Sequence, residues 1–210
     1  YRRQRQMCIR DSIWSVYTEC LHGMPSKCPI RVAVPVNLRP YFNSITTKNF
    51  FVMVSAEFHP TKETYTFAEV AAIVKESLRS QINRENLEKL FSYNVSNEKL
   101  LIARVVPLFL KNLAMKYVYT TSALANTATI TNIGNISVTE EYRPYVEMFH
   151  AFLAMSKGQH LKGTICSYGD TLVFSFSYDL VDASVQRGFF RKIASDGIAV
   201  EIKSNGVNYE

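Results

Sequence analysis

The sequence predicts an α/β protein in which a mixed β-sheet is flanked by helices. Two short apolar runs, residues 30–36 and 50–58, are rich in β-branched and aromatic residues, as is typical of buried strands. Apolar residues then recur at helical spacing over residues 67–78, and two alternating runs flank Gly169 and Asp170 in the manner of a β-hairpin. Strands and helices that alternate along one chain favour the α/β class.

Length and composition are those of a soluble domain. The chain has 210 residues, of which 47% are hydrophobic and 20% charged, which suffices for one domain with its own core. The longest stretch without charge, residues 117–139, is rich in Thr, Ser and Asn. We therefore expect no transmembrane segment.

Half of the net positive charge lies at one end of the chain. The formal net charge is +6, and residues 1–12 supply +3 of it. Their last six letters, MCIRDS, resemble a translated sequencing adaptor, so we exclude residues 1–12 from the predicted fold. We therefore expect that an upstream half of the natural protein is missing. Within the given chain, we expect one lobe at residues 13–205 and a tail at residues 206–210. A basic arm for nucleic acid or membrane is the alternative, and we expect no nucleic-acid partner.

The remaining cysteines predict neither disulfides nor a metal site. Cys20, Cys28 and Cys166 are odd in number, which favours reduced thiols and a cytoplasmic location. Cys20, His22 and Cys28 lack a fourth ligand and the spacing of common zinc sites. We expect them to be ordinary buried or partly buried residues.

The first half of the chain predicts two helices around two strands. Residues 12–21 have near-helical apolar spacing, and Gly23 follows where a helix would end. Pro35 removes one donor from the first strand, so it should lie at an edge, a bulge or a position facing a loop. Thr66 and Glu69 form a capping box that starts the helix over residues 67–78.

The middle of the chain predicts further helices. Residues 83–91 fit a short polar helix or an irregular connection, and residues 98–119 form an apolar periodic run with Pro107 inside it. The proline predicts a kink or two helices that meet there. With Lys111 and Lys116, this run is either a half-buried helix against the sheet or an interfacial membrane helix, and we prefer the former because its polar face is weakly charged.

The second half predicts most of the sheet. Residues 127–136 are typical of a strand, 145–155 of a strand or a helix, and 161–168 with 171–178 of a hairpin. Asp182 should cap a helix that Gly197 ends. Residues 198–203 are predicted to form a last short strand.

None of the four histidines has a convincing catalytic setting in the sequence. His22 lies in a turn, His59 precedes a proline and His160 opens a strand. His150 is surrounded by apolar residues, so it is the one histidine that we expect to be buried, either as a base with a shifted pKa or as a core residue.

A family resemblance enters at residues 35–40, P-V-N-L-R-P, and 48–51, K-N-F-F. These motifs resemble the opening of the C-terminal lobe in the coenzyme-A-dependent acyltransferase superfamily. The alcohol acetyltransferase branch, related to chloramphenicol acetyltransferase and to peptide-synthetase condensation domains, looks most similar. The resemblance runs over about residues 13–205 and implies one lobe of a two-lobed chloramphenicol-acetyltransferase-like fold.

The resemblance also implies where the chemistry lies. The family signature H-H-x-x-x-D-G, which carries the catalytic base on the N-terminal lobe, does not occur in this sequence, so no catalytic residue is expected here. Thr131, Asn132 and Gly134 resemble the family's Ser/Thr-Asn-x-Gly segment, which implies a tunnel wall and an oxyanion donor. A polar strand end is the alternative. Residues 175–182 resemble the S-x-D-H-R-x-x-D-G segment of lipoyl-dependent acyltransferases, with Leu180 where their histidine stands.

Asn37, Arg39 and Asn49 are expected to be structural members of the P-V-N-L-R-P region. Arg39 either contacts a coenzyme A phosphate or pairs within the fold, and we prefer pairing because an arginine at the end of a core strand usually needs a carboxylate partner nearby. Asn49 is expected to bond local backbone.

Three functions follow from these expectations. The first is half of an O-acyltransferase that uses a coenzyme A thioester as co-substrate and an alcohol as acceptor, without a metal, and that is inactive without its N-terminal lobe. The second is a non-catalytic binding or scaffold lobe. The third is a condensation-type domain that takes acyl groups from a carrier protein.

Overall fold

The computed structural model describes residues 2–99 and 106–205. Five strands form one mixed sheet in the order β2-β1-β3-β4-β5. The described elements are α1 (Arg2–Ser15), the π-helical turn η1 (Val16–Cys20), β1 (Ile30–Asn37), β2 (Phe51–Phe58), α2 (Phe67–Gln81), α3 (Arg84–Lys99), α5 (Leu108–Leu124), β3 (Ala128–Asn135), the 3₁₀ helix η2 (Glu140–Tyr145), β4 (Leu161–Tyr168), β5 (Thr171–Tyr178) and α6 (Ser184–Ser195).

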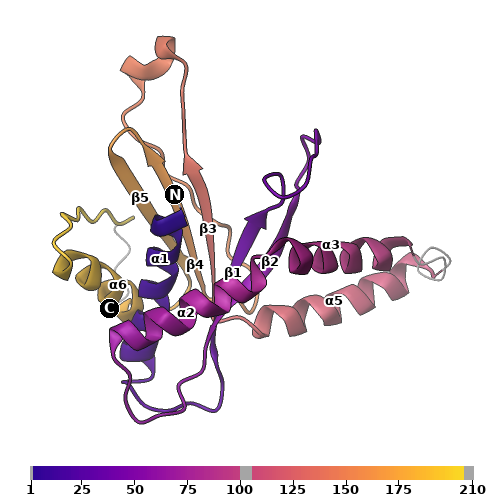
Figure 1. Cartoon of the computed structure of the whole chain (residues 1–210), viewed down its shortest axis with the longest axis horizontal. Helices are drawn as coiled ribbons and strands as arrows, with labels where there is room; N and C mark the ends of the chain where they lie inside the picture. The colour runs from indigo at the N-terminus through magenta and orange to yellow at the C-terminus, as the bar shows by residue number, and fades with distance from the viewer. Residues whose placement is uncertain (1, 100–105, 206–210) are drawn as a thin grey trace.

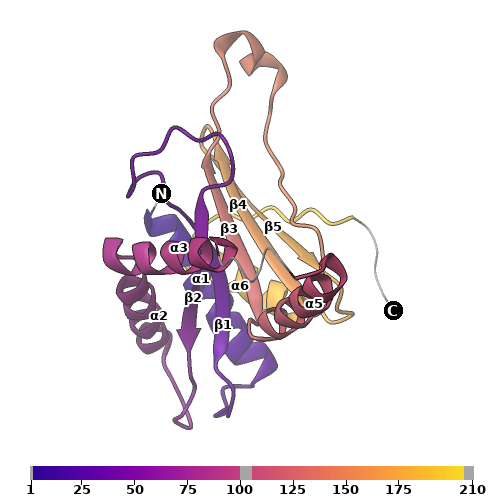
Figure 2. The same ribbon diagram turned by 90° about the vertical axis from the view of Figure 1, so that its right-hand side faces the viewer.

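Helices α1, α2 and α6 cover one face of the sheet (Figures 1 and 2). Alternate residues of the strands face these helices and form the core, which holds Val32 and Val34 of β1, Ile130 of β3 and Ile165 of β4. The described residues form no such layer of helices on the other face, and we call it the open face of the sheet. The predicted α/β class and the predicted strands over residues 30–36, 50–58, 127–136, 161–168 and 171–178 are confirmed.

Pro35 fits in β1 because the pairing of β1 with β3 ends before that residue. Strand β1 pairs with β3 only at Val32 and Ala33, whereas its antiparallel pairing with β2 continues from Ile30 to Asn37. The missing N–H of Pro35 therefore removes no bond from a ladder that is complete on both sides.

Helix α1 begins earlier than the sequence predicted. The expected start was Ser12, but the helix runs from Arg2, and Cys8 and Ile9 are buried at 1% and 0% exposure. Since Cys8 and Ile9 continue the apolar face of Ile13, the helix extends over residues that we had excluded from the fold. The adaptor origin of residues 1–12 is a separate matter and stays a prediction.

Asp11 is a buried carboxylate on this helix. Its Oδ1 accepts a hydrogen bond of 2.8 Å from Arg10 Nε, while Oδ2 has no partner within the described chain. Burial raises the pKa of Asp11 above its usual 3.8 more than Arg10 lowers it, so the fold favours the neutral form.

We therefore expect Asp11→Ala to stabilise the protein at pH 7 by roughly 1–3 kcal/mol, the cost of an unpaired buried polar group. A raised folded-state pKa means that wild-type stability is fully present below the unfolded pKa and is lost as pH rises through the folded pKa. The gain should accordingly shrink as pH falls toward 4. Urea unfolding from pH 4 to 7 tests this, with Asp11→Asn as the matched variant; equal pH profiles for all three proteins would contradict it.

The predicted capping box of α2 is present. Thr66 Oγ1 accepts from Glu69 N–H at 3.3 Å, and the Glu69 carboxylate accepts from Thr66 N–H at 2.8 Å. At its other end α2 protects the edge strand β2, because Gln81 Nε2 donates to Ser55 O at 2.7 Å and Gln81 Oε1 accepts from Ser55 N–H at 3.2 Å. A side chain thus replaces the neighbour that an edge strand lacks.

Residues 83–91, for which we predicted a short polar helix or an irregular connection, belong to the longer helix α3, whereas α5 differs from the half-buried helix that we preferred for residues 98–119. The two helices project from the body in one direction as an arm (Figure 1), and the large apolar side chains of α5 are exposed. Helix α5 begins directly after Pro107, as predicted for two helices that meet at that proline. Leu101, Ile102 and Val105 of the predicted run lie outside the described residues.

Two predicted strands are absent from the structure. Within residues 145–155, η2 ends at Tyr145 and the rest is extended but outside the sheet. Residues 198–203 are irregular as well. Both sequences have strand-like composition but find no neighbouring strand within the described residues, and a strand needs a neighbour to bond its backbone.

The predicted helix after Asp182 is confirmed as α6. Asp182 accepts from Ser184 N–H at 2.9 Å, and Gly197, at φ +82°, follows the last turn. Phe189 on α6 is fully buried and lies between Phe174 and Phe176 of β5, with ring centroids 4.4 and 5.2 Å away. These rings fasten α6 to the far end of the sheet.

Candidate functional site at the carboxyl end of the sheet

The carboxyl ends of β1, β3 and β4 point to one edge of the sheet, because these three strands are parallel. From β1 the neighbour on one side is β2, and on the other side β3 leads to β4. Strands β1 and β3 diverge toward that edge (Figure 1). In open α/β sheets, ligands bind outside the carboxyl ends of the strands where the strand order reverses. The β1/β3 boundary is such a point.

Three of the predicted site residues lie in β3, with Thr131 at the middle of the strand and Asn132 and Gly134 in its carboxyl-terminal half. The pairing with β4 shifts between Asn132 and Gly134, so Ile133 is an extra residue that makes a β-bulge. Asn132 Oδ1 accepts from Gly134 N–H at 2.7 Å, and Gly134 has φ +91°, a conformation that glycine adopts without strain. Asn132 is thus engaged in shaping the bulge, and only its amide nitrogen remains as a donor.

Thr131 faces the open side of the sheet. Its neighbour Ile130 is buried in the core under the helices, and side chains alternate along a strand. Across the sheet, Thr131 is in register with Thr164 of β4, which is in register with Ser175 of β5. Thr164 Oγ1 is buried and has no hydrogen-bond partner in the part of the chain that the structure describes. A row of hydroxyls therefore crosses the open face next to the bulge.

The segment after η2 lies over this row. Lys162 of β4 is buried at 7% exposure, and its Nζ donates to Ala154 O at 2.6 Å and to Ser156 Oγ at 2.7 Å. Cys166 Sγ donates to Phe149 O at 3.2 Å. Side chains of β4 thus hold the segment from Phe149 to Ser156 against the open face.

Asn37 and Arg39 form the turn after β1. Arg39 Nη2 donates to Thr46 O at 3.1 Å and to Lys48 O at 2.7 Å, and Asn37 Oδ1 accepts from Arg39 N–H at 3.1 Å. The arginine therefore closes the loop onto itself through carbonyl groups, whereas we had expected a carboxylate. Asn49 is exposed near the end of this loop.

Arg39→Ala should loosen this loop without unfolding the protein. The guanidinium is exposed and contacts only local groups, so we expect a loss of about 1 kcal/mol or less in global stability. Amide hydrogen exchange should become faster over residues 42–49, because the carbonyl groups of Thr46 and Lys48 lose the donor that holds the loop. Unchanged exchange there would mean that Arg39 does not order the loop.

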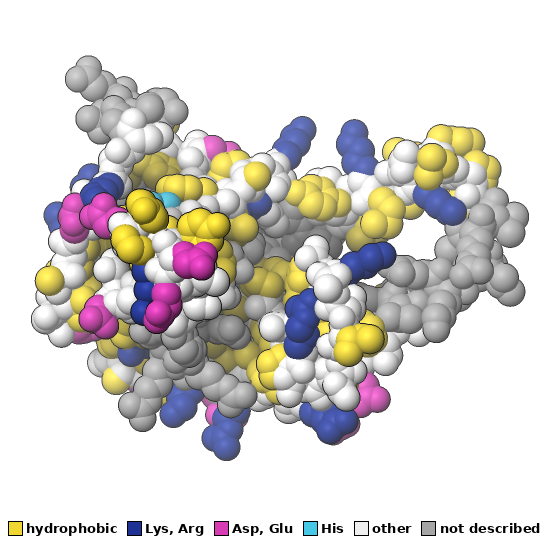
Figure 3. Space-filling model, turned by 90° about the horizontal axis from the view of Figure 1, so that it is seen from above, with side chains coloured by type: hydrophobic (Ala, Val, Ile, Leu, Met, Phe, Trp, Pro, Cys, Tyr) yellow, Lys and Arg dark blue, Asp and Glu magenta, His cyan; other side chains and the backbone are white. Residues whose placement is uncertain are grey.

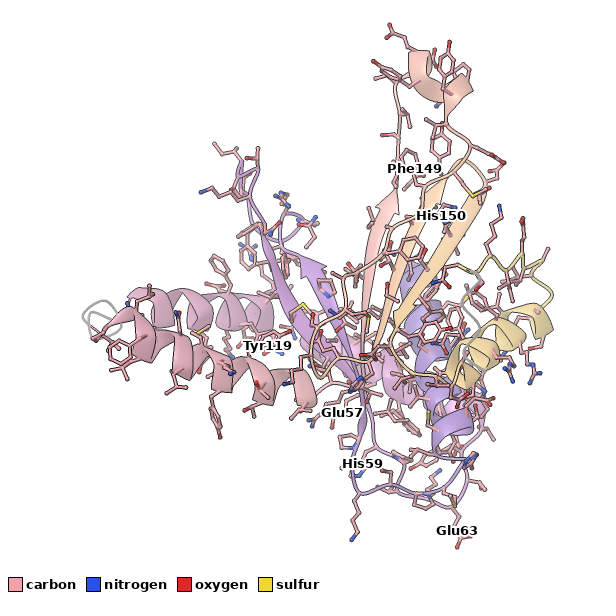
Figure 4. All side chains as sticks on the ribbon, turned by 180° about the vertical axis from the view of Figure 1, so that it is seen from behind. Glu57, His59, Glu63, Tyr119, Phe149 and His150 are labelled. Atoms are coloured by element: carbon pink, nitrogen blue, oxygen red, sulfur yellow. The ribbon has the colours of Figure 1, made fainter. Side chains whose placement is uncertain are left out.

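His150 is not the buried base that its apolar surroundings suggested. It is exposed, and its ring stacks on Phe152 with centroids 6.4 Å apart. The segment that carries it is extended on top of the sheet, so alternate side chains point to solvent. Figure 4 shows Phe149 and His150 near the carboxyl ends of β3 and β4, while Glu57, His59 and Glu63 lie toward the other end.

Sequence reasoning missed one histidine pair. His160 Nδ1 lies 2.9 Å from Asp179 Oδ1, and both side chains are about half exposed. The predicted hairpin could have revealed this pair. When the two strands are paired outward from the turn at Gly169 and Asp170, His160 and Asp179 lie opposite each other. They lie at the amino end of β4, at the opposite edge from Thr131, so this pair does not serve the candidate site. Leu180 is exposed beside it.

The structure offers no group of three metal-ligating side chains within the described residues. Cys8 and Cys166 are buried, whereas Cys20 and Cys28 are exposed, unlike the buried or partly buried positions that we predicted for the latter two. No helix in the described part of the chain is long and apolar enough to cross a membrane. The site is therefore built from hydroxyl, amide and backbone groups.

Comparison with known proteins shows the fold. No family model matches the sequence, and no curated protein does. Among solved structures, the chain is similar to the starter condensation domain of rhizomide synthetase RzmA, with a TM-score of 0.50 and 10% identity over 93% of this chain and 43% of that one. A structure of condensation domain-mediated chain release from the enacyloxin polyketide synthase matches with a TM-score of 0.40 and 10% identity, over 97% of this chain and 41% of the other.

The expected chloramphenicol-acetyltransferase-like fold, which condensation domains share, is thereby confirmed. The chain spans less than half the length of the solved chains that it matches.

Proposed function

We propose that this chain is the C-terminal lobe of an acyltransferase that moves an acetyl or longer acyl group from acyl-coenzyme A to the hydroxyl of an alcohol. The observation that carries the proposal is the position of Thr131, beside a β-bulge and a topological switch point, in a lobe with the fold of a condensation domain. A hydroxyl donor at such a place suits a reaction that develops negative charge on an oxygen.

The proposed reaction divides its work between two lobes. A histidine of the N-terminal lobe takes the proton of the alcohol, and the alkoxide attacks the thioester carbonyl. The tetrahedral intermediate places its negative charge on the former carbonyl oxygen, to which Thr131 donates. Collapse breaks the C–S bond, and the thiolate of coenzyme A leaves and recovers the proton from the histidine. Asn132 holds the bulge, and Arg39 orders the loop at the same edge.

A second candidate is a condensation-type reaction in which a carrier protein delivers the acyl thioester. The similarity of the fold to that of a starter condensation domain favours it. The chemistry at Thr131 is the same in both cases, because both donors are thioesters. The two candidates differ in what approaches the edge of the lobe.

Recovery of the DNA upstream of residue 13 tests the proposal. We expect an in-frame lobe of similar size that contains H-H-x-x-x-D-G. The two-lobed protein, given short alcohols, should then consume acetyl-coenzyme A, whereas the second candidate predicts transfer only from an acylated carrier. An upstream lobe without the histidine would instead leave a non-catalytic scaffold.

A further inference from the structure

Lys162 of β4 is a buried cation that pairs with no carboxylate of the described residues. The two acceptors that its Nζ bonds, Ala154 O and Ser156 Oγ, are both neutral. An ammonium group has three donors, so the third has no acceptor among the described residues. Lysine is almost never fully buried unless it is paired. What the burial of Lys162 secures is therefore the segment that carries its two acceptors.

This segment, Phe149 to Ser156, covers Thr164, and we call it the strap. Lys162 bonds one end of the strap, and Cys166 bonds the other. Thr164 lies between Lys162 and Cys166 on the same side of β4, because side chains alternate along a strand. The strap therefore passes over Thr164, whose exposure is only 2%. Strand register puts Thr131 directly beside Thr164, so the strap borders the proposed oxyanion donor.

The strap lays apolar side chains on a polar floor. The side chains of its inner side alternate with exposed ones and are partly buried, namely Phe149, Ala151, Leu153 and Met155. The ring of Phe149 contacts that of Tyr168 on β4, with centroids 5.3 Å apart. Seen from above, hydrophobic side chains lie among charged ones over η2 and the end of the sheet beneath it (Figure 3). Apolar side chains offer the hydroxyl group of Thr164 no partner, and Oγ1 has none within the described residues.

Few bonds fasten the strap. It belongs to no strand of the sheet and shares no backbone hydrogen bond with a strand in the part of the chain that the structure describes. It ends in a tight turn, in which Gln159 N–H donates to Ser156 O at 3.0 Å and Gly158 has φ +81°. Loss of the ammonium group of Lys162 should accordingly loosen the strap and leave the sheet intact.

We propose that Lys162 is a positioning residue, which fastens the strap and so keeps water away from Thr131 while the thioester is attacked. This inference rests on the proposed function. Water at the thioester carbonyl can replace the alcohol as nucleophile: its oxygen bonds the carbonyl carbon, the C–S bond breaks, and its proton passes through the histidine to the thiolate. The products are then a carboxylic acid and free coenzyme A. Excluding water prevents this side reaction and strengthens the hydrogen bond from Thr131 to the oxyanion.

Thiol labelling of the 210-residue chain tests whether Lys162 fastens the strap. Cys166 is 1% exposed and lies beneath the strap, so its alkylation by iodoacetamide reports opening. Lys162→Met keeps a side chain of similar length without the ammonium group, and it should accelerate alkylation of Cys166 at least about tenfold, since hydrogen bonds from a charged group are lost. Cys8, buried in the core, should stay as slow as in the wild type and so excludes global unfolding.

Two further variants make this test specific. Ser156→Ala removes one of the two acceptors and should accelerate alkylation of Cys166 less than Lys162→Met does. Lys157→Met removes the same charge from an exposed side chain of the neighbouring turn and should have no effect. Unchanged alkylation of Cys166 in Lys162→Met, or an equal acceleration in Lys157→Met, would overturn the inference.

Kinetics of the two-lobed protein test the exclusion of water. With acetyl-coenzyme A and a short alcohol, ester formation measures transfer, and thiol release in excess of ester measures hydrolysis. Lys162→Met should raise the ratio of hydrolysis to transfer at least about tenfold, and Lys157→Met should not change it. An unchanged ratio despite faster labelling of Cys166 would overturn this inference alone. A wild-type two-lobed protein that transfers no acyl group would refute the proposed function, and this inference with it.

Discussion

Thr131→Val is expected to lower kcat of the two-lobed enzyme by about 10²–10³, the range for loss of one oxyanion donor. Valine keeps the shape of threonine and its strand propensity but removes the hydroxyl. Since the hydrogen bond forms to charge that appears only in the transition state, KM should change little. Steady-state kinetics with acetyl-coenzyme A and a short alcohol measure both constants.

Thr129→Val is the matched control. Thr129 lies two residues earlier on β3, on the same face, opposite Ala33 where β1 and β3 still pair. Its distance from the carboxyl edge predicts a change in kcat of less than about threefold, within the effect expected of a surface substitution. Equal losses in both variants would mean that the open face matters for packing and that Thr131 donates to no oxyanion.

The 210-residue chain should show no acyl transfer at all in the same assay. It contains no H-H-x-x-x-D-G motif, and its two best-placed histidines are unsuited, since His150 points to solvent and His160 lies at the opposite edge from Thr131. Turnover by this chain alone would place the base within it and would refute the two-lobe mechanism.

The strands were predictable because their signal is local. In β4 and β5, alternation and the Gly169-Asp170 turn fix both the ends and the register, from Tyr168 opposite Thr171 to Leu161 opposite Tyr178. The capping box of α2 was predictable for the same reason, since Thr66 and Glu69 lie one turn apart. Such features depend on neighbours in sequence.

The wrong predictions concern long-range contacts. Residues 145–155 have the composition of a strand, but pairing requires the backbone of a second strand beside them, and here the side chains of Lys162 and Cys166 in β4 bond this segment instead. Helix α5 was expected to pack against the sheet because its apolar residues recur at helical spacing. That spacing does not show which element, if any, packs against the helix. Arg39 was expected to pair with a carboxylate, but in the structure it donates to two backbone carbonyl groups of its own loop.

The sequence indicated the residues of the candidate site but not their geometry. The sequence indicated Thr131, Asn132 and Gly134 as a group, yet only the bulge at Ile133 separates their roles. Asn132 accepts a hydrogen bond from Gly134 N–H and shapes the backbone, whereas the Thr131 side chain faces the open side of the sheet. The hydroxyl groups of Thr164 and Ser175 lie beside Thr131 because of the register between the strands. The local sequence of β3 does not predict that register.

Phe189→Ala should cause the largest loss of stability, about 3–5 kcal/mol, as is usual for a fully buried phenylalanine. Its ring is 0% exposed and contacts Phe174, Phe176 and Phe190, with centroids 4.4, 5.2 and 5.3 Å away. The cavity cannot collapse easily, because the surrounding rings are held by β5 and α6. Urea unfolding measures the loss, and Tm should fall by roughly 10 °C for a chain of this length.

Phe152→Ala is the control of equal chemistry, because Phe152 is 67% exposed and should change stability by less than about 0.5 kcal/mol. Gly163 shows how tightly the same cluster is packed: a Cβ there would lie 3.0 Å from Phe174 Cζ. Gly163→Val should therefore destabilise the protein through overpacking, by about 1–3 kcal/mol. If Phe189→Ala lowered the free energy of unfolding no more than Phe152→Ala does, these rings would not hold α6 against the sheet. The description of the core beneath β5 would then be wrong.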